Sequence, residues 1–286
     1  IMDPDPGKVA ALREEMHAAG ISCSRLTALV GDVRTAGLPP YFAEAAVAGS
    51  VGPTDAATIA AVYRCLRPFG GRFCLELDSG GHSRFETACA AARLEMSKVT
   101  REGGFSILTR EGLPLPTGNW GNAYGGDAAR TLTTQDALVK SPLGLLWFGG
   151  DASPNELYGR LGLGILCTHG GRAFTFSEKQ IFALDAYTGR MLWSVPGAGY
   201  ARDDKKPGPA FFAPAVDAAG LYVSNGRTIV EYVPATGKIS RQFPVLDDWG
   251  LGLNGVIILQ GDYLLIHSET ALVCISRQDG KALWTR

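Results

Sequence analysis

Hydrophobic and polar residues follow two different patterns along the chain, one on each side of a proline-rich stretch. Before this stretch, apolar positions recur at helical spacing between short apolar runs typical of strands. After it, short apolar runs alternate with glycine-containing turns, as in antiparallel β-structure. The stretch itself, Leu113-Pro-Leu-Pro116, disfavours both helices and strand ladders. We therefore predict one domain over residues 1–112 and a second over 113–286.

The first domain is predicted to alternate strands and helices. A short strand ends near Asp3, and Asp5 and Pro6 are suited to the N-cap and first position of a helix that ends before Gly20. The other strands are expected over 25–30, 43–48, 72–77 and 105–109, and the other helices over 55–67 and 85–99. Such alternation is typical of an α/β, Rossmann-like fold, here an incomplete doubly wound parallel sheet.

The second domain contains one motif three times. Each copy is an apolar run, a turn ending in glycine, a basic residue and another apolar run, and the glycines are Gly189, Gly237 and Gly280. Glycine adopts the positive φ that such a tight turn requires. A strand-rich unit that recurs every 40–50 residues or so is typical of a β-propeller blade. We therefore predict an all-β partial β-propeller of about three blades.

A tryptophan follows the basic residue at the same place in the first and third copies, as Trp193 and Trp284. A large ring at a fixed place can pack between neighbouring blades, which cannot bury both faces alone. The middle copy has Arg241 at this place. That blade has either lost its stacking ring or uses another one, such as Phe243.

The pattern Ala183-Leu-Asp-Ala-Tyr-Thr-Gly-Arg-Met-Leu-Trp193 resembles the repeat of quinoprotein-type, PQQ-like β-propellers, and the resemblance covers roughly residues 118–286. That family includes dehydrogenases that bind pyrroloquinoline quinone (PQQ) and calcium, and scaffold propellers that bind no cofactor. The dehydrogenases typically carry an adjacent Cys-Cys pair over the quinone, which this sequence lacks, so PQQ is not expected. The resemblance is compatible with a protein or glycan partner on the propeller and with a periplasmic or secreted location, and the sequence leaves both open.

Residues 1–112 resemble the C-terminal part of a class I S-adenosylmethionine-dependent methyltransferase. The resemblance rests on Asp3-Pro-Asp-Pro6, Val30-Gly-Asp32 and, most specifically, Tyr63-Arg-Cys-Leu-Arg-Pro-Phe-Gly-Gly71. It implies S-adenosylmethionine as cofactor. Asp3 would then hold the ribose, Asp32 and Val33 would flank the adenine, and Ser50 would lie near the methionine part. Read alone, Asp3 is equally a turn or cap residue, and Gly-Asp at Asp32 is a common turn.

The methyltransferase resemblance begins after the first strand and glycine-rich loop of that family. It therefore implies that the sequence is a fragment with an incomplete cofactor pocket, inactive as it stands. No catalytic residue and no methyl acceptor are identified. No Asp/Asn-Pro-Pro-Tyr motif follows the strand at 43–48, so a nucleic-acid amino-methylating enzyme is not supported.

Composition narrows the functional classes to which the protein can belong. With 286 residues, 46% hydrophobic content and a formal net charge of −1, the chain fits a globular protein without the basic footprint of nucleic-acid binding. Its apolar stretches are interrupted well short of a membrane span. The six cysteines and four histidines are scattered and include no Cys-x-x-Cys, so no metal site is expected and the cysteines are read as buried hydrophobes.

Three functions remain open at this stage. The first is a methyltransferase-like domain joined to a propeller that recruits substrate or partner. The second is a non-catalytic propeller scaffold with a degenerate methyltransferase-like insert. The third is a quinone-dependent dehydrogenase, for which no quinone or calcium ligands can be identified.

Overall fold

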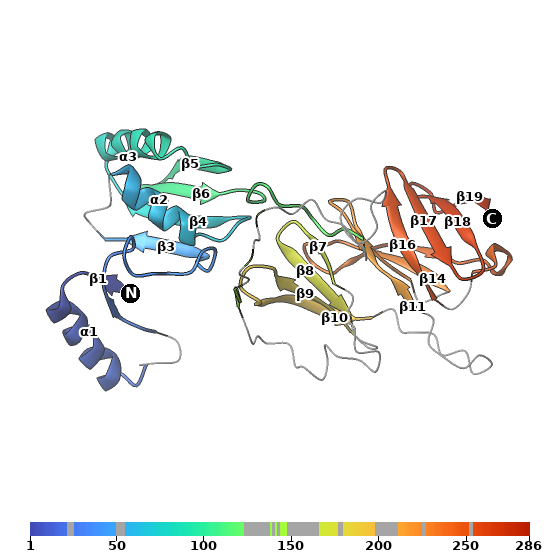
Figure 1. The fold of residues 1–286 in the computed structure, drawn as a ribbon, viewed down its shortest axis with the longest axis horizontal. Coiled ribbons are helices and arrows are strands. Elements are labelled where there is room, and N and C mark those ends of the chain that lie inside the picture. The colour runs from blue at the N-terminus through green and yellow to red at the C-terminus, as the bar shows by residue number, and fades with distance from the viewer. Residues whose placement is uncertain are drawn as a thin grey trace. The chain divides into compact units, whose positions relative to one another are not determined.

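The computed structural model describes residues 1–21, 26–49, 55–122, 138, 141, 144–147, 166–176, 180–197, 211–224, 227–251 and 254–286. They form two compact units, Ile1–Gly112 and Leu113–Arg286 (Figure 1). The first is α/β and the second is all-β, as the sequence predicts.

The described part of the first unit contains three helices and two sheets. The helices are α1 (Pro6–Ala18), α2 (Ala56–Cys65) and α3 (Ser79–Ala91). The smaller sheet is a parallel pair, β1 (Met2–Asp3) and β2 (Leu29–Val30). The larger sheet contains β3 (Ala45–Ala48), β4 (Gly71–Glu76), β5 (Ser97–Glu102) and β6 (Phe105–Arg110), in the order β3-β4-β6-β5.

The first helix begins at its predicted cap, and the second begins at Ala56, one residue after its predicted start. The carboxylate of Asp5 accepts hydrogen bonds from the amides of Gly7 and Lys8 at 2.8 and 3.3 Å, which satisfies donors that have no partner inside the helix. The carboxylate of Asp55 does the same for Thr58 at 2.8 Å. Ile59, Val62 and Tyr63 of α2 are buried, and so is Leu66, which directly follows the helix.

The third helix was predicted too late in the sequence. Instead of spanning 85–99, α3 begins at Ser79, because Asp78 caps it by accepting from the Gly81 amide at 2.6 Å. A Cβ at Gly81 would lie 3.1 Å from the Leu77 side chain, so a glycine fits this first turn closely. Residues 97–99 belong to β5, which pairs antiparallel with β6. Strand β4 is parallel to β3 and antiparallel to β6, so the larger sheet is mixed.

The described part of the second unit contains three sheets that each include four consecutive antiparallel strands, like propeller blades. The first has β7 (Cys167–His169), β8 (Arg172–Phe176), β9 (Gln180–Asp185) and β10 (Met191–Pro196). The second has β12 (Ala215–Val216), β13 (Leu221–Ser224), β14 (Thr228–Tyr232) and β15 (Ile239–Pro244). The third has β16 (Asn254–Gln260), β17 (Tyr263–Ser268), β18 (Leu272–Ser276) and β19 (Ala282–Thr285). Strand β11 (Phe211–Ala213) adds parallel to β16, and η1 (Asp247–Trp249) is a 3₁₀ turn.

The repeated motif folds into the same turn in each sheet. The amides of Gly189, Gly237 and Gly280 each donate to the carbonyl four residues earlier at 2.9 Å. The same three glycines have φ values of 71°, 70° and 73°, in the left-handed region that L-residues with a Cβ disfavour. The predicted role of the repeated glycine is therefore confirmed.

An aromatic ring from the preceding part of the chain packs on each of these glycines; we call this the ring–glycine contact. Trp147 covers Gly189, and Trp193 of the first sheet covers Gly237 of the second. In both cases the indole Nε1 also donates a hydrogen bond at 3.1 Å to a carbonyl of the covered turn, that of Ala186 or Pro234. Each tryptophan therefore both packs on the turn and hydrogen-bonds to it, and Trp193 in this way connects the first sheet to the second.

The ring–glycine contact between the second and third sheets divides these two roles between two residues. Phe243 covers Gly280, which confirms that the middle blade uses this ring. Arg241, at the tryptophan's place, donates from Nη1 to the Gln278 carbonyl at 3.0 Å. Its Nε also pairs with buried Glu231 at 2.8 Å, and its guanidinium lies 5.3 Å from the Phe243 ring centroid.

A second tie between the second and third sheets is centred on Arg277. Its guanidinium donates to both carboxylate oxygens of Asp217, at 2.7 and 2.9 Å, and to the Gly261 carbonyl at 2.8 Å. It also donates to the hydroxyl of Tyr222, a fully buried residue, at 3.1 and 3.2 Å. Planar, bidentate geometry of this kind makes Arg–carboxylate pairs strong and directional.

Acidification is expected to remove the stabilisation that the Asp217–Arg277 pair provides. Burial raises the pKa of Asp217, but hydrogen bonds from Arg277 and from the Gly220 amide outweigh burial and hold this pKa below its ordinary value. A carboxylate with a lowered folded-state pKa stabilises fully above its unfolded-state pKa, about 3.9, and loses this effect as the pH falls through the folded-state value. The difference in urea midpoint between the natural chain and Asp217→Asn should therefore shrink below about pH 4. A difference that stays constant down to about pH 2 would contradict this assignment.

Candidate functional site

The candidate cofactor site lies at the carboxyl end of the parallel pair β1–β2. Register pairs Asp3 with Val30, and the Gly31 amide donates to the Asp3 carbonyl at 3.1 Å. The two strands run in the same direction, so Asp3 and the Gly31-Asp32 turn lie at the same sheet edge. Ligands of open α/β sheets bind at this edge.

Asp3 belongs to a local turn and is also accessible. Its Oδ1 accepts from the Asp5 amide at 2.8 Å, which supports the turn interpretation. Its Oδ2 is 4.0 Å from Lys8 Nζ, and its side chain is 37% exposed. A carboxylate offers about four acceptor positions, so the turn leaves capacity for a ligand hydroxyl.

Asp32 is held by a residue that the sequence analysis did not single out. Arg34 donates to Asp32 Oδ1 from its backbone amide at 2.8 Å and from Nε at 2.9 Å, and Nη2 lies 3.3 Å from Oδ2. The side-chain and backbone hydrogen bonds from Arg34 lower the pKa of Asp32. Asp32 is therefore an anion at neutral pH whose orientation is fixed. An arginine two residues after Gly-Asp is the signal that could have indicated this pair.

Of the other two candidate residues, Val33 is described in the structure and Ser50 is not. Val33 is half-buried and packs against the cluster that includes Ile59, Phe73 and Phe85, so it links the β2 turn to the core of the larger sheet. Ser50 lies outside the described residues. The structure therefore places Asp3 and Asp32 at one edge, with Val33 following Asp32, and leaves the position of Ser50 undescribed.

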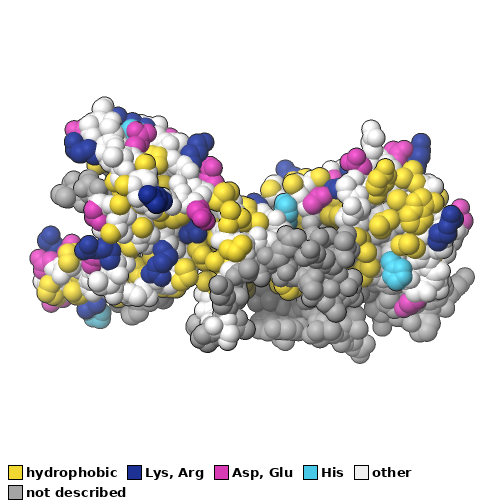
Figure 2. Space-filling model, turned by 45° about the horizontal axis from the view of Figure 1, so that its top comes forward, with side chains coloured by type: hydrophobic (Ala, Val, Ile, Leu, Met, Phe, Trp, Pro, Cys, Tyr) yellow, Lys and Arg dark blue, Asp and Glu magenta, His cyan; other side chains and the backbone are white. Residues whose placement is uncertain are grey.

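The strands near this edge have apolar side chains at the surface. Leu29 and Val30 on β2 are 41% and 48% exposed, and Val47 on β3 is 73% exposed. Hydrophobic side chains are visible among interspersed acidic and basic ones on the face of the first unit shown in Figure 2. Among the described strands, β3 pairs on one side only, with β4. An unpaired edge flanked by apolar side chains can accept another strand.

Other chemistries have little basis in the part of the chain that the structure describes. No group of three or more His, Cys, Asp or Glu residues could hold a metal there. The described cysteines are free, and Cys65, Cys89, Cys167 and Cys274 are buried as predicted. Burial raises the pKa of the Cys89 thiol to about 11, which disfavours the reactive thiolate. Within these same ranges, no helix is long and apolar enough to cross a membrane.

Comparison with known proteins gives only distant likenesses. No family model and no curated protein matches the sequence. Among solved structures, BamB from Moraxella catarrhalis is 16% identical (TM-score 0.33; 42% of this chain, 38% of that one). A quinohemoprotein alcohol dehydrogenase from Pseudomonas putida is 18% identical (TM-score 0.38; 50% and 22%). A protein named as an S-adenosylmethionine-dependent methyltransferase from Methanococcus maripaludis is 12% identical (TM-score 0.35; 40% and 67%).

The chain spans less than two thirds of the BamB and dehydrogenase chains that it resembles. With identities and TM-scores this low, the likenesses carry no argument about function. The assignment of α/β and propeller-like units rests on the strand order and on the repeated turns.

Proposed function

We propose that the first unit is an S-adenosylmethionine-dependent methyltransferase-like domain and that the propeller unit recruits its substrate or partner. The observation that supports this most is the placement of Asp3 and Asp32 at the carboxyl ends of two adjacent parallel strands. The proposal also rests on the sequence resemblance over residues 1–112.

The two carboxylates suit different parts of the cofactor. An acid at the end of a parallel strand can accept hydrogen bonds from both hydroxyls of a ribose, and Asp3 has an accessible carboxylate for this. Asp32 is anionic and fixed by Arg34, so it can accept from the exocyclic amine of adenine, with Val33 beside the ring. When bound, S-adenosylmethionine would supply an electrophilic methyl group on a sulfonium sulfur, which keeps the electron pair of the broken carbon–sulfur bond. The residues of this domain would bind and orient the cofactor, so the domain's task is mainly positioning.

Asp3→Asn is expected to weaken S-adenosylmethionine binding by about 10- to 100-fold, because hydrogen bonds to a charged group are worth about 1.5–3 kcal/mol. Isothermal calorimetry measures this effect. The resemblance implies a strand and glycine-rich loop ahead of Asp3, so the protein is produced with its natural upstream sequence wherever the gene encodes one. A natural protein that does not bind, or equal affinity in Asp3→Asn, would contradict the proposal.

Asp5→Asn is the matched control. It removes one negative charge two residues away, and asparagine caps helices as well as aspartate does. Its affinity should equal that of the natural chain. If Asp5→Asn weakens binding as much as Asp3→Asn does, the effect is general electrostatics and the ribose assignment is wrong.

The alternative is a non-catalytic propeller scaffold with a degenerate methyltransferase-like unit. The bidentate approach of Arg34 to Asp32 favours it, since it uses acceptor positions that a cofactor would need. A protein that binds no S-adenosylmethionine and retains a partner on the second unit would fit this function.

A further inference from the structure

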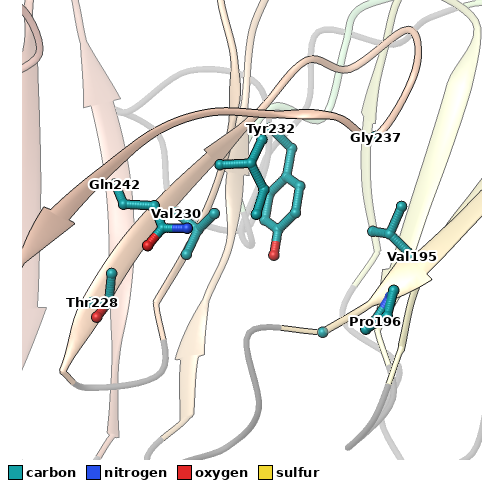
Figure 3. A pocket seen from close by; sticks show the side chains of 9 residues that line it. Val195, Pro196, Thr228, Val230, Tyr232, Gly237 and Gln242 are labelled. Atoms are coloured by element: carbon teal, nitrogen blue, oxygen red, sulfur yellow. The ribbon is translucent and has the colours of Figure 1, made fainter.

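A pocket of about 470 Å³ lies in the second unit between the edge strand β10 and strands β14–β15 (Figure 3). Its walls include Val195 and Pro196 from β10, and Val230, Tyr232 and Ile239 from the neighbouring sheet. Gln242 of β15 lies beside Val230, its cross-strand partner. None of the described residues that line the pocket carries a charge. We call this space the interblade pocket.

The hydroxyl of Tyr232 points into the interblade pocket, between Val230 on one side and Val195 and Pro196 on the other (Figure 3). The residue is only 2% exposed, and within the part of the chain that the structure describes its hydroxyl has no hydrogen-bond partner. A hydroxyl that faces open pocket space is available to donate to a ligand. Exchanging a hydrogen bond with water for one with the ligand adds about 0.5–1.5 kcal/mol.

The protonation of the Tyr232 hydroxyl and the polarity of Gln242 determine which ligand groups fit the pocket. Burial raises the pKa of Tyr232, so the phenol stays protonated at neutral pH and acts as a donor. Gln242 is exposed, and its amide carries both donors and an acceptor at the mouth of the pocket. The described lining of the pocket is thus mainly apolar, with Tyr232 as a hydrogen-bond donor inside and Gln242 as a polar residue at the mouth.

Size and charge exclude several ligand classes. The volume falls within the range of small-molecule sites, about 300–1,000 Å³, and is roughly three times that of a cavity that binds benzene. An ionic ligand would find no opposite charge among the lining residues, and burying an unpaired charge is costly. The ligand class that fits is neutral and mainly apolar, about the size of two fused rings.

We propose that the interblade pocket binds a neutral, mainly apolar small molecule whose carbonyl or ether oxygen accepts a hydrogen bond from Tyr232. A polar substituent of the ligand faces Gln242. This site is independent of the proposed methyltransferase function, because all its residues belong to the second unit.

The test uses Prodan, a neutral naphthalene with a ketone, whose emission shifts to the blue in apolar surroundings. Titration into the full chain should give saturable, blue-shifted emission. Tyr232→Phe removes only the hydroxyl and should weaken the affinity about 5- to 10-fold, the effect of one hydrogen bond. Ile239→Asp places a charge at the pocket wall, on a side chain that is 54% exposed, and should weaken it further.

Two controls separate the pocket from unspecific effects. Leu283→Asp makes the same kind of change on β19, at a side chain that is 52% exposed and outside the pocket lining, and should leave the affinity unchanged. The melting temperature of Tyr232→Phe should not fall, because the lost hydroxyl has no partner in the described structure. Absence of saturable binding, equal affinity in Tyr232→Phe, or an equal loss in Leu283→Asp would overturn the proposal.

Discussion

Replacing Arg277 with methionine is expected to lower the free energy of unfolding of the second unit by about 2–4 kcal/mol. Methionine keeps much of the apolar stem but leaves three groups without their donor: the Asp217 carboxylate, the Gly261 carbonyl and the Tyr222 hydroxyl. The Arg277 side chain is only 13% exposed, whereas that of Asp217 is 35% exposed. Water reaches the carboxylate, so the expected loss stays below that of a fully buried pair.

Urea denaturation followed by tryptophan fluorescence measures this loss selectively, because all five tryptophans lie after residue 112. Lys281→Met is the matched control, since it breaks an ion pair with Asp279 in which both partners are exposed, by 79% and 47%. It should change the midpoint very little. A loss in Arg277→Met no larger than that in Lys281→Met would mean that Arg277 does not tie the two sheets together.

Gly237→Ala is the second substitution with a large expected effect, a loss of about 2–5 kcal/mol. The alanine would have to adopt φ near 70°, and its Cβ would lie 2.7 Å from the Trp193 ring. The ring would then move off the turn, and its hydrogen bond to the Pro234 carbonyl would break. Both the backbone strain and the lost contact destabilise the folded state.

Gly261→Ala separates these two causes. Gly261 also has a positive φ, 54°, but a Cβ there would meet nothing within 4 Å. Its loss should be limited to about 1–2 kcal/mol of backbone strain. Near-UV circular dichroism of Gly237→Ala should also show a change in tryptophan packing that is absent in Gly261→Ala. Equal losses in both variants would refute the importance of the ring–glycine contact.

The sequence predicted those features of the fold that depend on interactions between neighbouring residues, such as helix caps and tight turns. The caps Asp5 and Asp55 and the repeated glycines each act on residues within one turn of themselves, so a linear sequence suffices to find them. The helix predicted over 85–99 starts too late, because Gly80 and Gly81 are weak helix formers, although Asp78 caps the helix ahead of them. The antiparallel direction of β6 depends on pairing with β4, which no local pattern reveals.

The sequence likewise predicts some residues of the candidate sites and misses those that depend on contacts between distant parts of the chain. Asp3 and Asp32 could be predicted to share an edge, because parallel strands bring their carboxyl ends together. The Tyr232 hydroxyl could not be identified, because its environment includes Val195 and Pro196 of another sheet. The Arg277–Asp217 pair joins residues sixty positions apart, and no local pattern links an arginine to an aspartate at that separation.

The ring–glycine contacts also determine how the propeller unit tolerates random mutation. At Trp193, a single codon change can remove both the packing on Gly237 and the hydrogen bond to the turn. Between the second and third sheets, Phe243 provides the packing and Arg241 the hydrogen bond. No single substitution of a side chain there removes both. A mutation at this junction can therefore remove only one of the two roles at a time, whereas its neighbour depends on a single tryptophan. Arg241 is still constrained, because it also pairs with buried Glu231.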